Sequence, residues 1–169
     1  PLFDPSLYRL LRPVEFDGLK TLVASYVPFG LSDEARPVLE LPEVLTRELM
    51  HQFMIPQSGI RVWGADHAFA SLAFAAPVSK DVQSLAASLT LPYCGVNSGF
   101  EAAQWLDDPA SAMSIAMIPL RHGGVVDAFG MLVLASPDPT RYTADMGTEF
   151  LQRIGELASA ALSRLLPVG

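Results

Sequence analysis

Two apolar stretches near the C-terminal end of the chain limit the possible folds more than any other feature. They are residues 111–120, SAMSIAMIPL, and residues 125–136, VVDAFGMLVLAS. The second stretch carries apolar side chains on both faces of an extended strand, which is typical of a strand covered on both sides. The link RHGG, residues 121–124, supplies glycines for the positive φ angles of a tight connection. The sequence therefore predicts a long, buried antiparallel hairpin.

A long amphipathic helix is predicted after this hairpin. Thr143 has the side chain of an N-cap, and Asp145 and Glu149 would lie in the first turns, where the helix dipole favours carboxylates. An apolar stripe then continues to the end of the helix, and its members are Met146, Phe150, Leu151, Ile154, Leu157, Ala158, Ala161, Leu162 and Leu165. A stripe this wide predicts burial against the sheet and a second contact, for which a partner subunit is one candidate.

Gly147 falls inside the first turn of this predicted helix, where glycine costs about 1 kcal/mol relative to alanine. Such a glycine either lets a phosphate approach the helix N-terminus or lets the helix pack closely on a strand. Because Asp138, Asp145 and Glu149 make the surroundings negative, we interpret Gly147 as a packing glycine.

Helices and strands also alternate before the hairpin. Residues 41–53, LPEVLTRELMHQF, predict a helix with Pro42 in its first turn and leucines on one face. Residues 58–64, SGIRVWG, predict a strand that places Ile60 and Val62 on one face.

The remaining segments have weaker patterns. Residues 79–89 predict a short helix capped by Ser79, and residues 97–106 predict a second short helix. Residues 65–77, ADHAFASLAFAAP, fit either a strand or an apolar loop. Residues 16–27 predict a helix that lies outside the main core or meets a partner. We therefore divide the chain into an N-terminal helical arm or linker, residues 1–39, and one domain, residues 40–169.

The composition limits the classes of partner. Half of the 169 residues are apolar and 17% are charged, which indicates a folded domain. The net charge of −7 argues against direct binding of nucleic acid or of an anionic membrane. No apolar run approaches the roughly 20 residues of a membrane span. The single cysteine, Cys94, fits a reducing compartment, so we expect a cytoplasmic protein.

No metal or cofactor site is predicted. The common motifs of nucleotide-binding proteins, zinc proteases and serine hydrolases are absent, and His51, His67 and His122 are far apart in the sequence. A ligand pocket of unknown specificity remains open, and its candidate residues are Arg61, Trp63, Tyr93, Cys94, Asn97 and Trp105. Aromatic residues at such positions more often belong to the core.

Two features leave a catalytic interpretation open. Cys94 is either a reactive thiol or a small buried residue, and we favour burial because no basic residue near it in sequence would lower its pKa. Asp107 and Asp108 are either a paired-carboxylate site or a turn, and the following Pro109 favours the turn.

Several segments resemble GAF domains. The exit from the last strand, GMLVLASPDPTRYTADM, and the terminal helix, FLQRIGELASAALSRL, resemble the end of that fold, with Arg141-Tyr142-Thr143 as the step between strand and helix. PYCG, SAMSIAMIPL, LASPDPTRY and MGTEFLQRIGEL resemble recurring segments of the DUF484 family of bacterial GAF-like proteins. The resemblance covers about residues 40–166.

The resemblance implies an α/β (α+β) fold with a central antiparallel sheet of about six strands, flanking helices and a long C-terminal amphipathic helix. It also implies a regulatory or interaction module without catalytic activity or cofactor, with an optional small-molecule ligand. A homodimer through the terminal helices is expected, and its candidate interface residues are Leu19, Val23, Ile154, Leu157, Ala158, Ala161, Leu162 and Leu165.

Two alternatives stay open beside this interpretation. One is an enzyme of an unrecognised type that uses Cys94 or the Asp107/Asp108 region. The other is a pure scaffold that positions an N-terminal helix for a partner protein. The motifs by which GAF domains bind cyclic nucleotides or bilins, and the several cysteines of the methionine-sulfoxide reductases of this fold, are absent from the sequence.

Overall fold

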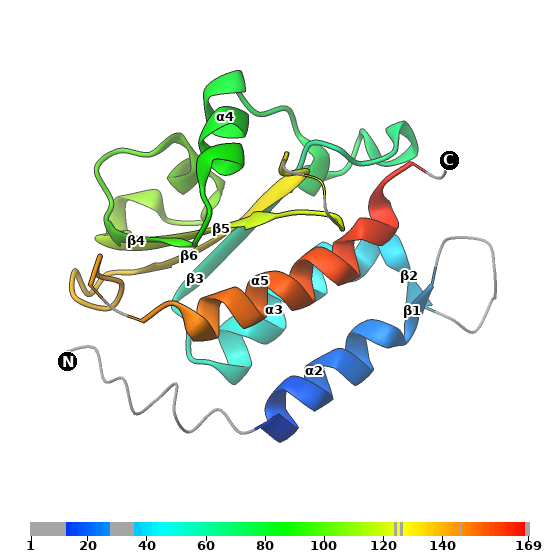
Figure 1. Ribbon diagram of the computed structural model, residues 1–169, viewed down its shortest axis with the longest axis horizontal. Helices are drawn as coiled ribbons and strands as arrows, with labels where there is room; N and C mark the ends of the chain where they lie inside the picture. The colour runs from blue at the N-terminus through cyan, green and yellow to red at the C-terminus, as the bar shows by residue number, and fades with distance from the viewer. Residues whose placement is uncertain (1–12, 28–35, 124, 126, 146, 168–169) are drawn as a thin grey trace.

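Four antiparallel strands form the centre of the computed structural model, which describes residues 13–27, 36–123, 125, 127–145 and 147–167 (Figure 1). The strands are β3 (Gln57–Val62), β4 (Tyr93–Val96), β5 (Ser114–Leu120) and β6 (Gly130–Ser136). Their order in the sheet is β3-β6-β5-β4, so β5 and β6 form the predicted hairpin at the centre. The antiparallel sheet is confirmed, but the expected number of about six strands is wrong.

The segment that follows β3 explains part of this difference. Residues 65–77 form two turns of 3-10 helix, η2 (His67–Phe69) and η3 (Ala73–Ala75), instead of a strand. The Asp66 carboxylate accepts a hydrogen bond from the Ala68 N–H at 2.9 Å and caps η2, which holds this segment out of an extended conformation. Two further strands, β1 (Tyr26–Val27) and β2 (Arg36–Pro37), pair only with each other.

Helices cover both faces of the sheet. One face packs against α3 (Leu41–Gln52) and α5 (Glu149–Leu162), with α2 (Pro13–Ala24) packed against these two helices. The other face is covered by α4 (Lys80–Ser88) and the 3-10 turn η4 (Glu101–Trp105), as Figure 1 shows. The second short helix predicted at residues 97–106 is therefore only this 3-10 turn. No described helix is long and apolar enough to cross a membrane.

Several local predictions are confirmed. The helix predicted at residues 41–53 is α3, and Pro42 lies in its first turn. Ser79 caps α4, because its hydroxyl accepts a hydrogen bond from the Val82 N–H at 3.1 Å. The helix predicted at residues 16–27 corresponds to α2, but its predicted position outside the main core is wrong, because Leu19 and Val23 are buried in the same core as α3 and α5. Residues 1–12 and 28–35, within the predicted arm, lie outside the described residues.

The start of the last helix differs from the prediction. Helix α5 begins at Glu149, with Thr148 rather than Thr143 at the N-cap position. Gly147 precedes the helix and is exposed, and a Cβ atom at this position would meet nothing within 4 Å. The interpretation of Gly147 as a packing glycine is therefore wrong. Gly155 has that role, because a Cβ atom there would lie 2.7 Å from Cγ2 of Ile118 on β5.

The segment between β6 and α5 is fixed by its own polar side chains. The Asp138 carboxylate accepts hydrogen bonds from the N–H and hydroxyl of Thr140 at 2.9 and 2.7 Å, and these bonds lower the pKa of Asp138. The Ser114 hydroxyl donates to the Asp138 carbonyl at 2.7 Å and accepts from the N–H of the buried Tyr142 at 3.3 Å. These bonds keep the segment in a loop, which explains why the helix starts later than predicted.

Three arginines bind the carbonyl groups at helix ends. Arg141, in the step from β6 to α5, donates to the carbonyl oxygens of Phe53 and Met54 just after α3. Arg121 donates to two carbonyl oxygens at the end of α4, and Arg164 to two at and after the end of α2. Cations favour this end of a helix because its last carbonyl groups lack partners within the helix. The Arg141-Tyr142 step thus has a structural role.

Candidate functional site

The six residues predicted to line a ligand pocket do not form one site. Arg61 and Trp105 lie together, with the guanidinium carbon 5.6 Å from the centre of the indole ring. Trp63 donates from Nε1 to the Ala128 carbonyl at 2.9 Å, which fixes its ring near the end of β3. Tyr93 packs edge to face against Phe100, with ring centres 5.1 Å apart.

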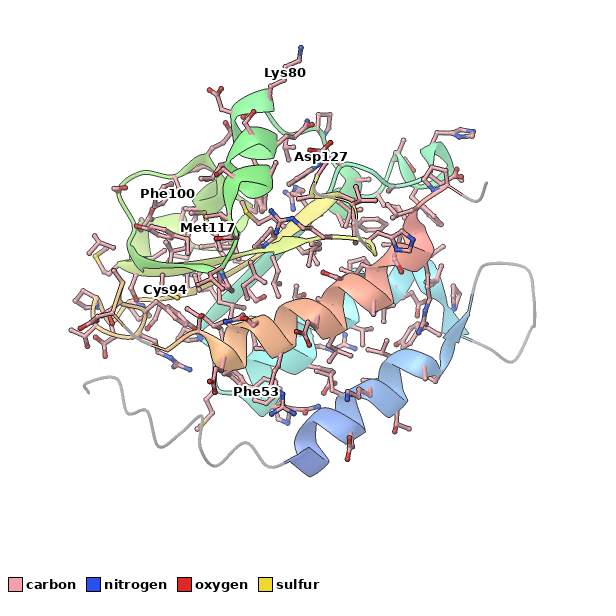
Figure 2. The ribbon with its side chains drawn as sticks, viewed as in Figure 1. Phe53, Lys80, Cys94, Phe100, Met117 and Asp127 are labelled. Carbon is pink, nitrogen blue, oxygen red and sulfur yellow. The ribbon has the colours of Figure 1, made fainter. Side chains whose placement is uncertain are left out.

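The two remaining candidates have structural roles. The Asn97 amide donates to the Ala112 carbonyl at 3.0 Å and accepts from the N–H groups of Gly99 and Phe100, so it fixes a turn. Cys94 is buried on the α5 side of the sheet. Phe100 and Met117 pack instead on the α4 side, as Figure 2 shows. The strand alternation therefore separates Cys94 from the other candidates.

The close contact between Arg61 and Trp105 depends on Gly59. Arg61 and Gly59 lie on the same face of β3, two residues apart. A Cβ atom at Gly59 would lie 3.1 Å from the Trp105 carbonyl oxygen and 3.3 Å from Trp105 Cβ. The absence of a side chain at Gly59 thus brings η4 close to β3, and with it the indole beside the guanidinium.

Arg61 and Trp105 border a groove of about 420 Å³ beside β3, which we call the edge groove. Its lining comes from the segment leading into α3, from β3 itself, from η3 and from η4. The lining residues are Leu39, Glu40, Pro42, Glu43, Thr46, Gly59, Ile60, Arg61, Leu72, Ala73, Phe74 and Trp105. The sequence analysis found only Arg61 and Trp105 among them. A pair of glutamates around the α3 N-terminus is the one local signal that would have pointed to the rest.

The edge groove carries charged side chains that form no ion pair within the described residues. Glu40 and Glu43 are exposed at one side, and neither forms an ion pair with a basic residue that the structure describes. On the other side, the Arg61 guanidinium donates to the Ile60 carbonyl at 2.9 Å and forms no ion pair with a described carboxylate. Partial burial lowers the pKa of Arg61. The groove therefore presents two carboxylates, a guanidinium and an aromatic ring, and Cys94 is not among its lining residues.

Two other grooves lie along α5. One, of about 570 Å³, runs between α5 and the ends of β5 and includes Arg121 and His122. The other, of about 360 Å³, separates α5 from α2 and includes Lys20 and Arg164. Arg121 and Arg164 already bind helix-end carbonyl groups, and neither groove contains a residue predicted to contact a ligand. The edge groove is therefore the candidate binding site.

Cys94 does not have the surroundings of a catalytic thiol. Its side chain is 6% exposed, and burial raises its pKa to about 11 from the ordinary value of 9.0. A thiol with this pKa is ionised in only about one molecule in 10⁴ at pH 7, and the thiolate is the reactive form.

We therefore expect Cys94 in the folded protein to react with a disulfide reagent at pH 8 at least tenfold more slowly than in urea-unfolded protein. Equal rates in the two states would contradict this assignment.

The raised pKa of Cys94 also makes the stability of the fold depend on pH. Because the folded state favours the protonated thiol, its contribution to stability is complete below pH 9 and is lost as the pH rises toward 11.

Asp107 and Asp108 form a turn, as their sequence context predicted. Both side chains are exposed, and the backbone of Asp108 pairs with the Gln57 side chain through hydrogen bonds of 2.8 and 2.9 Å. A short 3-10 turn, η5 (Pro109–Ser111), follows directly. His51, His67 and His122 are exposed, and the described residues contain no cluster of three or more groups suited to a metal.

The residues proposed for a dimer interface lie inside the chain. Seven of the eight are at most 4% exposed, namely Leu19, Val23, Ile154, Ala158, Ala161, Leu162 and Leu165. Leu157 is half-buried and packs against the same core. The second contact of the wide α5 stripe is therefore made by α2 and α3 of the same chain, and these side chains are not available to a partner subunit in this arrangement.

Comparisons with known proteins agree with the resemblance seen in the sequence. Residues 50–166, more than half of the chain, match the family described as protein of unknown function, DUF484. The fold is similar to the crystallised GAF domain of a protein assigned as a sensor histidine kinase from Pseudomonas syringae pv. tomato. The TM-score is 0.54 at 15% identity, and the match covers 95% of this chain and 89% of that chain. Among curated proteins, none matches the chain.

Proposed function

We propose, for a chain that belongs to the DUF484 family and has the GAF fold, that it is a regulatory module that binds another molecule without transforming it. The edge groove is its binding site. The fold supports a regulatory role, since the similar solved domain comes from a protein assigned as a sensor kinase. Fold alone does not define a function, so the proposal depends on the properties of the groove.

The observation that carries the proposal is the unpaired charge around a preformed, partly aromatic groove. Arg61, Glu40 and Glu43 border the groove, and none of them forms an ion pair with a described residue. Trp105 supplies a large, rigid contact surface of the kind that is enriched at binding sites. Charged groups around an apolar groove orient a bound molecule and select it by charge.

The surroundings of the two catalytic candidates support binding over catalysis. The Cys94 thiol is buried away from the edge groove, and burial raises its pKa. The backbone of Asp108 serves as part of a turn beside Gln57. Neither arrangement places a nucleophile or a general base beside the edge groove.

The proposal is tested by replacing the gene in the organism of origin. We expect Glu43→Lys and Trp105→Ala to reproduce the proteome changes of a complete deletion, because both alter the groove. Cys94→Ser and Asp107→Asn, as matched controls, should leave the proteome like that of the wild type. Equal abundance of the variants and far-UV circular dichroism would show that each is folded. If the controls reproduce the deletion while the groove variants do not, the proposal is wrong.

A further inference from the structure

Arg61 and Trp105 form one wall of the edge groove, which we call the basic wall. The guanidinium stacks on the indole ring and donates from Nη1 to the Ile60 carbonyl. It makes no other hydrogen bond and no ion pair with a described residue, and the indole N–H of Trp105 donates to none. A guanidinium stacked on an aromatic ring keeps the N–H groups at its edge available for a carboxylate. The basic wall is therefore suited to bind an anionic group.

Glu40 and Glu43, at the start of α3, form the opposite wall, which we call the acidic wall. Both side chains are exposed, and neither carboxylate accepts a hydrogen bond or forms an ion pair within the described part of the chain. Carboxylates bind ammonium groups through charge-assisted hydrogen bonds. The acidic wall is therefore suited to bind the amine of a ligand.

The two walls lie on different faces of the sheet. Ile60 packs in the core that contains α3, whereas Trp105 packs against the core on the α4 side. Because side chains alternate along a strand, Arg61 projects to the Trp105 side. Apolar side chains line the groove between the walls, namely Leu39, Pro42, Ile60, Leu72 and Phe74. A ligand that contacts both walls thus crosses the edge of β3, with its charges at opposite ends of an apolar body.

From this arrangement, and resting on the proposed function, we infer that the edge groove binds a small, elongated zwitterion. Its carboxylate accepts hydrogen bonds from Arg61, its ammonium group pairs with Glu40 and Glu43, and its apolar body lies along the apolar lining. The groove volume of about 420 Å³ is that of a small-molecule site. Short apolar peptides with free termini and unbranched amino acids with a terminal amine share this chemistry.

The charges of the groove disfavour other classes of ligand. A molecule with only negative charges would meet Glu40 and Glu43, and one with only positive charges would meet Arg61. An α-amino acid carries both charges on one carbon atom, so it reaches only one wall. Selection therefore depends on the sign of each charge and on the distance between the two.

Calorimetry on the purified full chain tests this inference with a panel of apolar dipeptides, apolar tripeptides and unbranched amino acids with a terminal amine. We expect binding at millimolar concentration or below, at least tenfold tighter than the binding of leucine. The tighter of the two sources identifies the natural one. N-acetylation or C-terminal amidation should each weaken binding at least tenfold, because each removes one charge-assisted contact. Absence of binding across the panel, or equal binding of the capped forms, would overturn the inference.

Variants assign each end of the ligand to its wall. Arg61→Gln should weaken the free acid at least tenfold and change the affinity for the amidated form by less than about twofold. The Glu40→Gln/Glu43→Gln double variant should do the same for the free amine and the N-acetylated form. A structural disturbance of the groove would instead weaken the free and capped forms alike, and that result would contradict the assignment.

Matched controls come from the first turn of α4. Lys80→Gln and Asp81→Asn change the net charge by one unit each at positions that do not line the edge groove. Both should leave the affinity within about twofold, and circular dichroism would show that all variants are folded. Weakening by these controls equal to that of the groove variants would show that binding occurs elsewhere or depends on net charge alone, and would overturn the inference.

The binding and proteome experiments can fail separately. If the groove variants reproduce the deletion proteome but no member of the panel binds, the regulatory function stands and the zwitterion fails. If a zwitterion binds with the expected dependence on Arg61 and the glutamates but the groove variants leave the proteome unchanged, the site stands and the proposed function fails.

Discussion

Replacement of Leu162 by glutamate is expected to unfold the domain rather than to separate two subunits. Leu162 is the last residue of α5 and is fully buried in the core shared with α2 and α3. Loss of a buried leucine side chain costs about 2–5 kcal/mol, and an unpaired buried carboxylate adds several more. The sum is comparable to the whole stability of a typical domain, about 5–15 kcal/mol. Urea unfolding followed by circular dichroism would measure the loss.

Leu157→Glu is the matched variant on the same helix. Leu157 is half-buried beside the groove between α2 and α5, so its new carboxylate can reach water and the variant should remain folded. Light scattering on this variant therefore tests the expected homodimer, because a change in mass would not result from unfolding. A folded Leu162→Glu protein would contradict the assignment of Leu162 to the core, whatever its oligomeric state.

Gly130→Ala is expected to have the second large effect. Gly130 is the first residue of β6, where β3 and β5 flank it, and an added Cβ atom would lie 2.6 Å from the Arg61 carbonyl oxygen. Because the contacted atom belongs to the backbone of β3, relief of the clash requires the two strands to separate. Overpacking of this kind costs about 1–3 kcal/mol, and we expect the upper end of that range.

Gly18→Ala provides the opposite control. Gly18 lies within α2 and is exposed, and an added Cβ atom would meet nothing within 4 Å. Alanine should stabilise the helix by about 0.5–1 kcal/mol. Thermal unfolding of the two variants side by side should therefore shift the Tm in opposite directions. A Gly130→Ala protein as stable as the wild type would show that β3 and β6 are less tightly paired than the register indicates.

The sequence predicted the elements whose patterns are local and strong. The β5–β6 hairpin, α3 and the Ser79 cap of α4 were all predicted, because each depends on a periodicity or a capping side chain a few residues away. The predicted start of α5 at Thr143 was wrong, because the local capping pattern at Thr143 does not show the hydrogen bonds that hold this segment in a loop. Hydrogen bonds of Asp138 and Ser114, the latter from a distant strand, keep that segment in a loop.

The candidate site was predicted only in part. Arg61 and Trp105 were chosen as separate side chains, and their contact depends on Gly59 letting η4 approach β3. The acidic wall at Glu40 and Glu43 was missed, because no local pattern connects the start of α3 with η4. Tyr93 and Asn97 were predicted to line the same pocket as Arg61. In the structure, Tyr93 packs against Phe100, and the Asn97 side chain donates to the Ala112 carbonyl.

By itself the sequence determined the family, the antiparallel hairpin and the apolar face of the last helix, because these properties are written in short-range patterns and in recognisable segments. Only the tertiary structure decided that α2 and α3 cover the α5 stripe, and that Trp105 lies beside Arg61 at the edge groove. The physical reason is that burial and strand neighbours depend on contacts between distant segments. Identical local patterns are compatible with several such arrangements.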